Sequence, residues 1–429
     1  MRGLAFDVLG ADRHHVWHPY TQHGAADPPI PIVRAEGAYL VDDQGREIFD
    51  AISSWWVTLH GHAQPDIVNA IASQAQTLEQ VIFAGFTHEP AARLAASLVE
   101  RAPVGLDRVF FSDDGSTAVE VAVKIALQYW VNRGEQRRTI VALENAYHGD
   151  TFGAMSVSAR GLFTEPFENL LFDVARLPDP VTNDVVSALE EMISRRGREL
   201  AAVIVEPMLM GAGGMRMWSA GALRGIRELT AAHGIPLIAD EVLTGFGRTG
   251  PLFACEHAAV SPDLMCLSKG ITGGFVPLGA TLATNELFES FTSRDRSKTL
   301  FHGHSYTANP IACAAGVASL ALLDEHSVER RREIGWSHRA AATGLQLLDG
   351  IRNVRVLGTV MALDLVSRDA GYLSTVGPAL NRFALQRGVL LRPLGNTVYV
   401  LPPYCSTDDD LARAYDAIAD FVESLGDPR

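Results

Sequence analysis

Short apolar runs alternate with longer amphipathic stretches through the middle of the chain, and this alternation restricts the possible folds most strongly. Runs such as Ile235-Pro236-Leu237-Ile238-Ala239 are apolar at consecutive positions, which is typical of strands buried on both faces of a parallel sheet. We therefore predict an α/β fold, with a mostly parallel sheet flanked by helices on both faces. The expected strands are 107–111, 139–143, 201–205, 236–239, 263–267 and 278–284, and the expected helices are 66–81, 90–101, 116–132, 183–196 and 219–233.

The two ends of the chain have a different pattern. Residues 38–41 and 46–49 flank Asp42-Asp43-Gln44-Gly45, a hairpin signal with glycine at the turn. We predict a smaller α+β domain formed by residues 1–65 and 326–429, attached to a large domain of residues 66–325. Its C-terminal part is expected to contain strands 354–357, 360–366, 388–392 and 397–401 with helices 327–349, 375–387 and 408–425, after a helix at 307–323.

One long connection stands apart from the alternating pattern. Residues 144–182 are expected to form a loop that is long for a compact domain. Loops of this length are commonly functional or form interfaces.

Composition excludes several classes of function. The formal charge of the 429-residue chain is -14, which argues against a nucleic-acid partner. The N-terminus has an acid at Asp7 where a signal peptide needs an apolar segment, and the apolar stretch 312–323 is too short to span a bilayer. We therefore expect a cytoplasmic protein with no membrane partner. Four widely spaced cysteines indicate reduced thiols, with neither a disulfide framework nor a metal site: Cys255, Cys266, Cys313 and Cys405.

Two ionisable residues follow predicted strands. Asp240 stands at the end of the run 235–239, and Lys269 follows 263–267 and precedes a glycine-rich segment. Ligands of open α/β sheets bind outside the carboxyl ends of the strands. A lysine amine and a carboxylate are what pyridoxal phosphate (PLP) needs, the first to condense with its aldehyde and the second to keep its ring nitrogen protonated. The alternative is an aspartate that caps a strand and a lysine on a solvated turn.

Two further segments suit the same cofactor. Ser112 to Ala118 lead from strand 107–111 into the helix predicted at 116–132, and Gly115 and Ser116 are the expected phosphate contacts. The alternative is an ordinary helix cap. Tyr147 follows strand 139–143 and is the candidate to stack on a flat ring, with His148 as a supporting neighbour. The alternative is a structural pair in a loop.

Three features suit a substrate. Trp55 and Trp56 would point to opposite faces if they lay on a strand, so that one packs in the core while the other lines a pocket; both could equally be core or interface residues. Arg392 ends an apolar run, where a guanidinium can bind a substrate carboxylate bidentately. The alternative role for Arg392 is a surface ion pair. The segment 301–310 offers hydroxyls ahead of a long helix and could reach a phosphate across a dimer interface.

Taken together, these motifs resemble the class III, or ω-, aminotransferases of the fold type I PLP enzymes, over essentially the whole chain. The motifs that carry the resemblance are Asp113-Asp114-Gly115-Ser116, Tyr147-His148-Gly149, Asp240-Glu241-Val242, Gly245-Phe246-Gly247-Arg248-Thr249-Gly250, Ser268-Lys269-Gly270 and Gly303-His304-Ser305-Tyr306.

A narrower resemblance is to the branch of this class that acts in biotin synthesis. It implies 8-amino-7-oxononanoate as the amino acceptor and S-adenosyl-L-methionine as the donor, with lysine as the alternative donor. Other members carry Gly-Pro-Thr where this chain has Gly303-His304-Ser305, and this departure leaves the donor open. The narrower motifs are Trp17-His18-Pro19-Tyr20-Thr21, Ser53-Ser54-Trp55-Trp56, Gly211-Ala212-Gly213-Gly214-Met215 and the segment from Arg392 to Tyr399.

The resemblance also implies roles for particular residues. Lys269 would be the catalytic lysine that carries the cofactor, and Asp240 would pair with the ring nitrogen. Gly115, Ser116, Tyr147, His304 and Ser305 would bind the cofactor, with Ser305 supplied by the neighbouring subunit of a homodimer. The substrate pocket would be lined by Tyr20, Trp55, Trp56, Tyr147, Asp150, Gly303 and Tyr399, with Arg392 holding the keto-acid carboxylate.

Three other functions compete with this interpretation. The first is a class III aminotransferase for ornithine, 4-aminobutyrate or a diamine, or the aminomutase that shares the fold. The second is a non-catalytic PLP-binding regulator, although no spare basic segment is available for a DNA-binding domain. The third is a nicotinamide dehydrogenase, which ranks last because no G-x-G-x-x-G follows the first strands.

Overall fold

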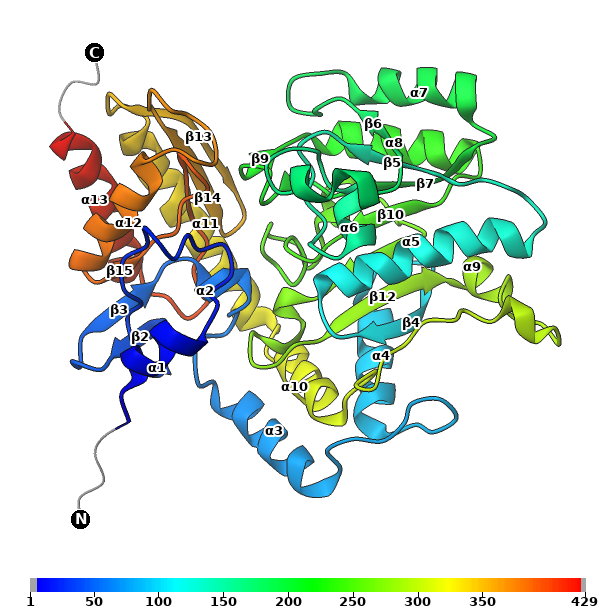
Figure 1. Ribbon diagram of the computed structural model, residues 1–429, viewed down its shortest axis with the longest axis horizontal. Helices are drawn as coiled ribbons and strands as arrows, with labels where there is room; N and C mark the ends of the chain where they lie inside the picture. Colours follow the sequence, from blue (N-terminus) through cyan, green and yellow to red (C-terminus); the bar gives the residue numbers. More distant parts are fainter. Residues whose placement is uncertain (1–5, 426–429) are drawn as a thin grey trace.

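The computed structural model describes residues 6–425, which fold into a larger and a smaller lobe (Figure 1). The larger lobe is built on a seven-stranded sheet with the order β4-β12-β11-β10-β7-β5-β6. Neighbouring strands from β11 to β6 are parallel, whereas β12 is antiparallel to both β11 and β4. The strands are β4 (Leu106–Ser112), β5 (Thr139–Leu143), β6 (Val174–Leu177), β7 (Leu200–Val205), β10 (Leu237–Asp240), β11 (Leu264–Leu267) and β12 (Gly279–Thr284).

The predicted α/β fold with a mostly parallel sheet is confirmed, and β12 is its exception. Only residues 268–278 connect β11 to β12. A parallel neighbour needs a crossover of a dozen or more residues, usually with a helix, whereas an antiparallel neighbour needs only a turn. The short connection therefore reverses β12.

Side chains from successive residues of the central strands enter two separate cores. In β5, Ile140 and Ala142 pack beneath α5 (Gly115–Asn132), while Val141 and Leu143 pack on the other face. Because both faces are covered, every position of these strands must be apolar, which explains the continuous apolar runs. The second face is covered by α7 (Val185–Arg196) and α8 (Ala220–Ala232).

The expectation of a long loop over residues 144–182 is wrong. This stretch contains α6 (Phe152–Val157), a 3-10 turn (Glu165–Leu170) and β6, which pairs in parallel with β5. Strand β6 lies at the edge of the sheet, and three of its four residues are only partly buried. It therefore lacks the continuous apolar run that marks the central strands, and its sequence includes Arg176.

The smaller lobe joins segments from both ends of the chain. The predicted hairpin is confirmed, with Leu40 opposite Ile48, and β15 from the C-terminal part pairs in parallel with β3. The domain limits at residues 65 and 325 stay a prediction. The first sheet of this lobe contains β1 (Ile32–Glu36), β2 (Tyr39–Asp42), β3 (Glu47–Asp50) and β15 (Val389–Leu390). The second sheet contains β13 (Ile351–Leu357), β14 (Val360–Leu365) and β16 (Thr397–Val400). The helices of the lobe are α11 (Glu325–Leu345), α12 (Val376–Gln386) and α13 (Asp408–Ser424).

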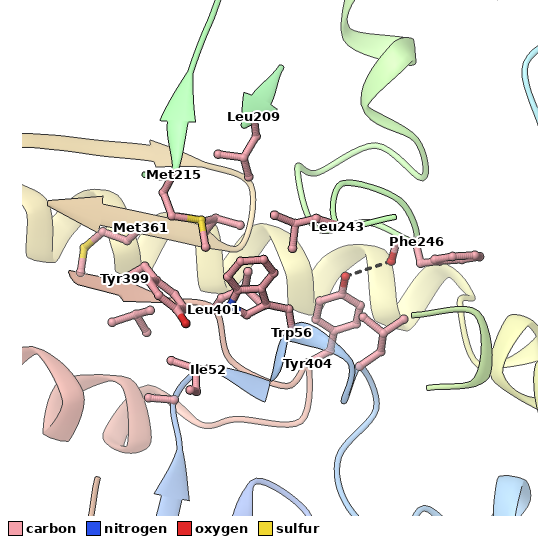
Figure 2. Close-up of a cluster of buried hydrophobic side chains, with 14 of the residues drawn as sticks. Ile52, Trp56, Leu209, Met215, Leu243, Phe246, Met361, Tyr399, Leu401 and Tyr404 are labelled. Atoms are coloured by element: carbon pink, nitrogen blue, oxygen red, sulfur yellow. Dashed lines mark hydrogen bonds between the residues drawn. The ribbon is translucent and has the colours of Figure 1, made fainter. Parts of the chain in front are cut away.

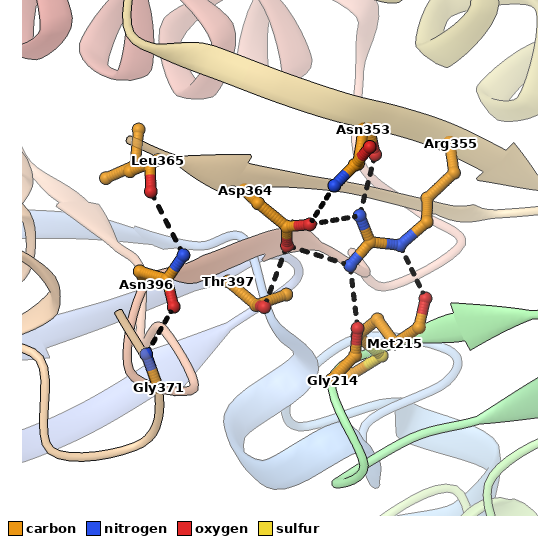
Figure 3. Close-up of polar contacts among 9 residues, drawn as sticks. All are labelled: Gly214, Met215, Asn353, Arg355, Asp364, Leu365, Gly371, Asn396 and Thr397. Carbon is orange, nitrogen blue, oxygen red and sulfur yellow. Dashed lines mark hydrogen bonds and ion pairs between the residues drawn. The ribbon is translucent and has the colours of Figure 1, made fainter. Parts of the chain in front are cut away.

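Arg355 of β13 links the two lobes (Figure 3). Its guanidinium donates hydrogen bonds to the carbonyl oxygens of Gly214 and Met215, each at 2.7 Å, in a loop of the larger lobe. The same guanidinium pairs with Asp364 at 3.1 Å, and Thr397 donates to that carboxylate at 2.8 Å. The smaller lobe therefore holds this loop, which leads to the cavity described below.

The remaining elements are helices, short strands and 3-10 turns that connect or cover the sheets. Helix α10 (Pro310–Ala321) packs against α3 (Pro65–Thr77) and α4 (Glu89–Arg101). The helix expected at 66–81 is α3, which ends four residues earlier, at Thr77. The others are α1 (Val8–His15), α2 (Ser53–Trp56), α9 (Asn285–Glu289), β8 (Leu209–Met210), β9 (Arg216–Met217) and 3-10 turns at Ala254–Ala258, Lys269–Thr272 and Arg296–Lys298.

Within residues 6–425, no single helix is long and apolar enough to cross a membrane. Helices α10 and α11 meet the length and composition criteria only as a pair, and they are bent by 73° at the break between them. The expected cytoplasmic location stays a prediction. All four cysteines are free thiols; Cys405 is exposed and the other three are buried.

Candidate active site

A cavity of about 670 Å³ lies at the carboxyl edge of the parallel strands. The residues that follow four neighbouring strands meet there, as expected for an open α/β sheet. The cavity wall includes Asp240, Lys269, Glu206, Tyr147, His148, Asp150, Gly115, Ser116 and Trp56. The structure therefore brings half of the candidate site residues onto one cavity wall, although they come from five separate segments of the chain.

Asp240 is the last residue of β10 and is 5% exposed. His148 Nδ1 donates a hydrogen bond to its Oδ2 at 2.7 Å, and the backbone N–H of Val242 donates to its Oδ1 at 3.1 Å. The other imidazole nitrogen, Nε2, is buried and has no hydrogen-bond partner in residues 6–425. His148 thus fixes the carboxylate within the wall of the cavity.

Glu206 is a cavity residue that the sequence analysis missed. It directly follows β7, and since Val205 pairs with Ala239, it lies beside Asp240 at the same sheet edge. Its carboxyl group accepts hydrogen bonds from the N–H groups of Tyr147 and Gly211, both at 2.9 Å. The strand-end rule that selected Asp240 applies equally to this residue.

Lys269 begins a short 3-10 turn after β11, with a left-handed φ of 20°. Burial lowers the pKa of its amine, while the carboxylates of Asp240 and Glu206 act in the opposite direction. The Nζ atom lies 5.2 Å from the centre of the Trp56 ring. Lowering the pKa of a lysine raises the share of its neutral amine, which is the form that acts as a nucleophile or base.

The first turn of α5 forms a polar cradle on the cavity wall. Asp114, rather than a serine or threonine, caps the helix by accepting a hydrogen bond from the N–H of Thr117 at 2.8 Å. Gly115 and Ser116 line the cavity, and their N–H groups precede the first intrahelical bond. Ser116 Oγ lies 2.8 Å from Thr151 Oγ1. These groups form an anion-binding arrangement.

Gly149 allows this cradle to form. Its φ is 124°, a left-handed value that favours glycine, and a Cβ atom at this position would lie 2.4 Å from Ser116 Oγ. The glycine therefore lets the loop after β5 lie directly against the start of α5.

The two tryptophans lie in the kinked turn α2 rather than on a strand. Trp56 is 4% exposed and packs edge-on against Tyr399, with a centroid distance of 5.8 Å (Figure 2). Trp55 is 38% exposed. One ring is therefore buried and the other faces outward, but the kink separates them rather than the alternation of a strand.

Arg392 lies at the rim of the site, outside the cavity wall. Its guanidinium carbon is 4.3 Å from the centre of the Trp55 ring, and no ion pair involves Arg392 among residues 6–425. The alternative of a surface ion pair is therefore wrong.

Tyr20 packs edge-on against Trp55 at 5.7 Å and donates a hydrogen bond to Asp150 at 2.5 Å. Burial raises the pKa of Tyr20 to about 12, so its hydroxyl stays protonated.

Two more aromatic residues extend this rim. Phe163 packs edge-on against Tyr20 at 5.8 Å, and Tyr372 packs edge-on against Phe163 at 4.6 Å. Both residues lie in irregular segments far apart in the sequence. No periodic pattern could have selected them, since only the tertiary structure brings them to the rim.

The segment Gly303–Ser305 does not line the cavity of its own chain. The backbone carbonyl of Ser305 accepts a hydrogen bond from Gln80, and His304 Nε2 lies 3.7 Å from the carboxylate of Asp113, which does line the cavity. The expectation that Ser305 acts in the site of a neighbouring subunit stays a prediction.

Glu206 is expected to make the ligand-free protein less stable as pH rises from about 5 to about 8. Burial raises the pKa of this carboxyl group to about 7 from an ordinary value of 4.5. Between these values the folded chain holds one more proton than the unfolded chain, so raising the pH favours unfolding. Across this pH range the free energy of unfolding of the wild type, measured with urea, should fall by on the order of 2–3 kcal/mol because of this group. The Glu206→Gln variant should not show this fall.

Glu190→Gln is the matched control for this measurement, because Glu190 is an exposed residue of α7. Its pH profile should run parallel to that of the wild type. A Glu206→Gln profile that is also parallel to the wild type would show that the buried carboxyl group does not titrate in this range.

Comparisons with known proteins agree with this geometry. The family model for class III aminotransferases matches residues 20–422. The chain is 50% identical to the adenosylmethionine-8-amino-7-oxononanoate aminotransferase of Synechococcus elongatus, over 96% of this chain and 99% of the relative. The crystal structure of the enzyme of the same name from Methanocaldococcus jannaschii superposes with a TM-score of 0.93 at 34% identity, covering 97% of this chain and 98% of that one.

An amine transaminase from an uncultivated Pseudomonas species, solved in its PLP-bound form, is also similar. Its TM-score is 0.89 at 32% identity, covering 96% of this chain and 99% of that one. The family match over nearly the whole length, together with the likeness to relatives above 30% identity, defines the family. The chain belongs to the class III aminotransferases.

Proposed function

We propose that this protein is a PLP-dependent aminotransferase that converts 8-amino-7-oxononanoate to 7,8-diaminononanoate in biotin synthesis, with S-adenosyl-L-methionine as the amino donor. The observation that carries the proposal is the meeting of the Lys269 amine and the buried Asp240 carboxylate on one cavity. The reaction follows the name of the relative that is 50% identical over 96% of this chain.

The residues of the cavity fit PLP, which has a phosphate, a basic ring nitrogen and an aldehyde. The N–H groups of Gly115 and Ser116 and the Ser116 hydroxyl suit the phosphate. Asp240 would hold the ring nitrogen, since His148 already fixes its orientation. Tyr147 lies on the same wall and would stack on the ring.

When bound, PLP supplies an aldehyde that condenses with amines and a ring that accepts electrons from the reacting substrate carbon. Lys269 Nζ would first bind the aldehyde and, once the donor amine replaces it, would move protons to and from the reacting carbon. Burial lowers the pKa of this amine, which favours the neutral form that can accept a proton. Asp240 would keep a positive charge on the ring nitrogen, so that electrons flow toward it.

The rim residues suit a long keto acid. Arg392 has no carboxylate partner among the described residues, so its guanidinium is available to a substrate carboxylate. Tyr20 and Trp55 form an aromatic surface between this cation and the cavity. The aliphatic part of 8-amino-7-oxononanoate can lie against these rings, and the sulfonium of an S-adenosyl-L-methionine donor can rest on an aromatic face.

Turnover tests the proposal directly. Purified protein is incubated with 8-amino-7-oxononanoate and, in separate reactions, with S-adenosyl-L-methionine, lysine, ornithine or 4-aminobutyrate. Each half-reaction is followed by the absorbance of the cofactor, and the diamine product by mass spectrometry. We expect the diamine with S-adenosyl-L-methionine. A diamine formed only with lysine would change the donor, and no diamine with any donor would contradict the biotin assignment.

Arg392→Ala is expected to weaken the keto-acid half-reaction and to leave the donor half-reaction largely intact. Loss of a bidentate carboxylate contact should raise KM for 8-amino-7-oxononanoate about 10- to 100-fold. Arg382→Ala is the control, because Arg382 lies in the same lobe and pairs with Asp27 on the surface. Equal damage to both half-reactions would rule out a dedicated carboxylate site at Arg392.

We also propose a homodimer in which Ser305 reaches the partner's cavity. Four exposed apolar residues support this proposal: Ile82, Phe86, Phe301 and Tyr306. The two segments that carry them are joined by hydrogen bonds from Gln80 and Asn309. Exposed apolar side chains on neighbouring segments suit a protein interface. Light scattering should give a mass close to twice the chain mass of 46.3 kDa, and a monomer would contradict the proposal.

A further inference from the structure

The turn that carries Trp55 and Trp56 has a strained backbone. Ser53, Ser54 and Trp56 have left-handed φ values of 54°, 59° and 70°, and Ser54 combines its φ with a ψ of -91°. Residues with a side chain rarely adopt such conformations, and they keep them only where the surroundings impose them. Something outside the turn must therefore hold it.

Asp50, the last residue of β3, makes the contacts that hold this turn. Its side chain is fully buried, and both carboxylate oxygens accept a hydrogen bond from the N–H of Ser54, at 2.8 and 2.6 Å. The Ser54 hydroxyl donates to the same carboxylate at 3.0 Å, and His62 Nε2 donates to it at 2.9 Å. Three donors from two segments therefore converge on one buried carboxylate.

The turn held by Asp50 sets the position of two walls of the site. Trp55 supports the Arg392 guanidinium at 4.3 Å and packs against Tyr20. Trp56 lies 5.2 Å from the Lys269 amine. If the turn relaxed, the aromatic rim and the cation above it would move together, whereas Asp240 and the α5 cradle lie on other elements and would stay in place.

We propose that Asp50 is a positioning residue for the amino acceptor. It holds the strained Ser53–Trp56 turn in the conformation that places Trp55, and through it Arg392, at the substrate rim. The role toward a keto acid rests on the proposed function, but the hold of Asp50 on the turn does not.

The test compares Asp50→Asn with Asp42→Asn in the holoenzyme. Asparagine keeps the size of the side chain but replaces one acceptor oxygen by a donor, which then faces Ser54 or His62. We expect KM for 8-amino-7-oxononanoate to rise about tenfold, because small misplacements of binding groups are costly, while cofactor content stays that of the wild type. In cofactor-free protein, the near-ultraviolet circular dichroism of the tryptophans should also change.

Asp42 is a closely matched control. It is equally buried and ends the neighbouring strand β2, where it accepts hydrogen bonds from the N–H groups of Gln44 and Arg46 in a turn that does not line the cavity. Asp42→Asn should lower the melting temperature and leave KM and the tryptophan dichroism unchanged. A merely structural role for Asp50 predicts the same behaviour for both variants.

Rescue separates strain from other effects of the substitution. Glycine adopts left-handed conformations without penalty, so adding Ser54→Gly to Asp50→Asn should return KM to within about threefold of the wild type. If Asp50→Asn does not fold by itself, the double variant should fold and show that same KM.

Any of four results would overturn the role of Asp50: a KM within twofold of the wild type in Asp50→Asn, an equal rise in Asp42→Asn, no recovery in the double variant, or a double variant that does not fold. A wild-type enzyme that does not use 8-amino-7-oxononanoate would instead reject the proposed function. The same comparison is then made with the acceptor that the wild type does use.

Discussion

Replacing Lys269 by alanine is expected to reduce turnover by at least about 10³-fold, because the variant lacks both the amine that binds the cofactor and the base that moves the proton. The fold should be kept, since the Lys269 amine makes no hydrogen bond within residues 6–425 and its removal leaves no polar partner unpaired. Steady-state kinetics measures the loss, and far-ultraviolet circular dichroism checks the fold.

Covalent labelling gives a second measure for the same variant. Borohydride should fix the cofactor to the peptide that contains Lys269 in the wild type and to no peptide in Lys269→Ala. Lys298→Ala is the control, because Lys298 donates a hydrogen bond to the Asn132 carbonyl, remote from the cavity wall; its rate and labelling should match the wild type. Wild-type turnover by Lys269→Ala would show that the lysine has no catalytic role.

Asp240→Asn is expected to lower the rate of both half-reactions by about 10²- to 10⁴-fold. A neutral amide cannot keep the ring nitrogen protonated, and it also weakens the 2.7 Å hydrogen bond from His148. Since both half-reactions use the same ring, they should fall together, unlike those of Arg392→Ala. Single-turnover kinetics with each substrate alone separates the two patterns.

The control for this substitution is Asp263→Asn. Asp263 precedes β11 at the opposite end of the sheet, where it pairs with Arg227 at 2.6 Å. Its loss should cost stability but change each half-reaction less than twofold. If Asp240→Asn kept more than a tenth of the wild-type rate, Asp240 would not be the partner of the ring nitrogen.

Much of the larger lobe could be predicted because its strands are covered on both faces. Residues such as Ile140 and Val141 must both be apolar, so each central strand appears as a continuous run. The same constraint locates Asp240 and Lys269, since the charges can begin only where these strands end. It would also have located Glu206, which follows β7 in the same way.

Other features could not be predicted because their determinants are distant in sequence. The edge strand β6 is partly exposed, so its residues carry no apolar run. Phe163 and Tyr372 reach the rim from irregular segments with no periodic pattern. The conformation of the turn at Trp55 could not be predicted, since it depends on the buried Asp50 and on the carbonyl of Leu401, which accepts a hydrogen bond from Ser53 at 2.8 Å.

The sequence by itself determined the α/β fold, the strand ends that carry the lysine and the aspartate, and the resemblance to class III aminotransferases. These properties follow from burial and from local motifs, which a linear pattern records. The tertiary structure alone decided that Glu206 lies beside Asp240, that Arg392 rests on Trp55 without an ionic partner, and that a strained turn holds the tryptophans. Each of these depends on contacts between segments that are distant in the sequence, which form only when the chain has folded.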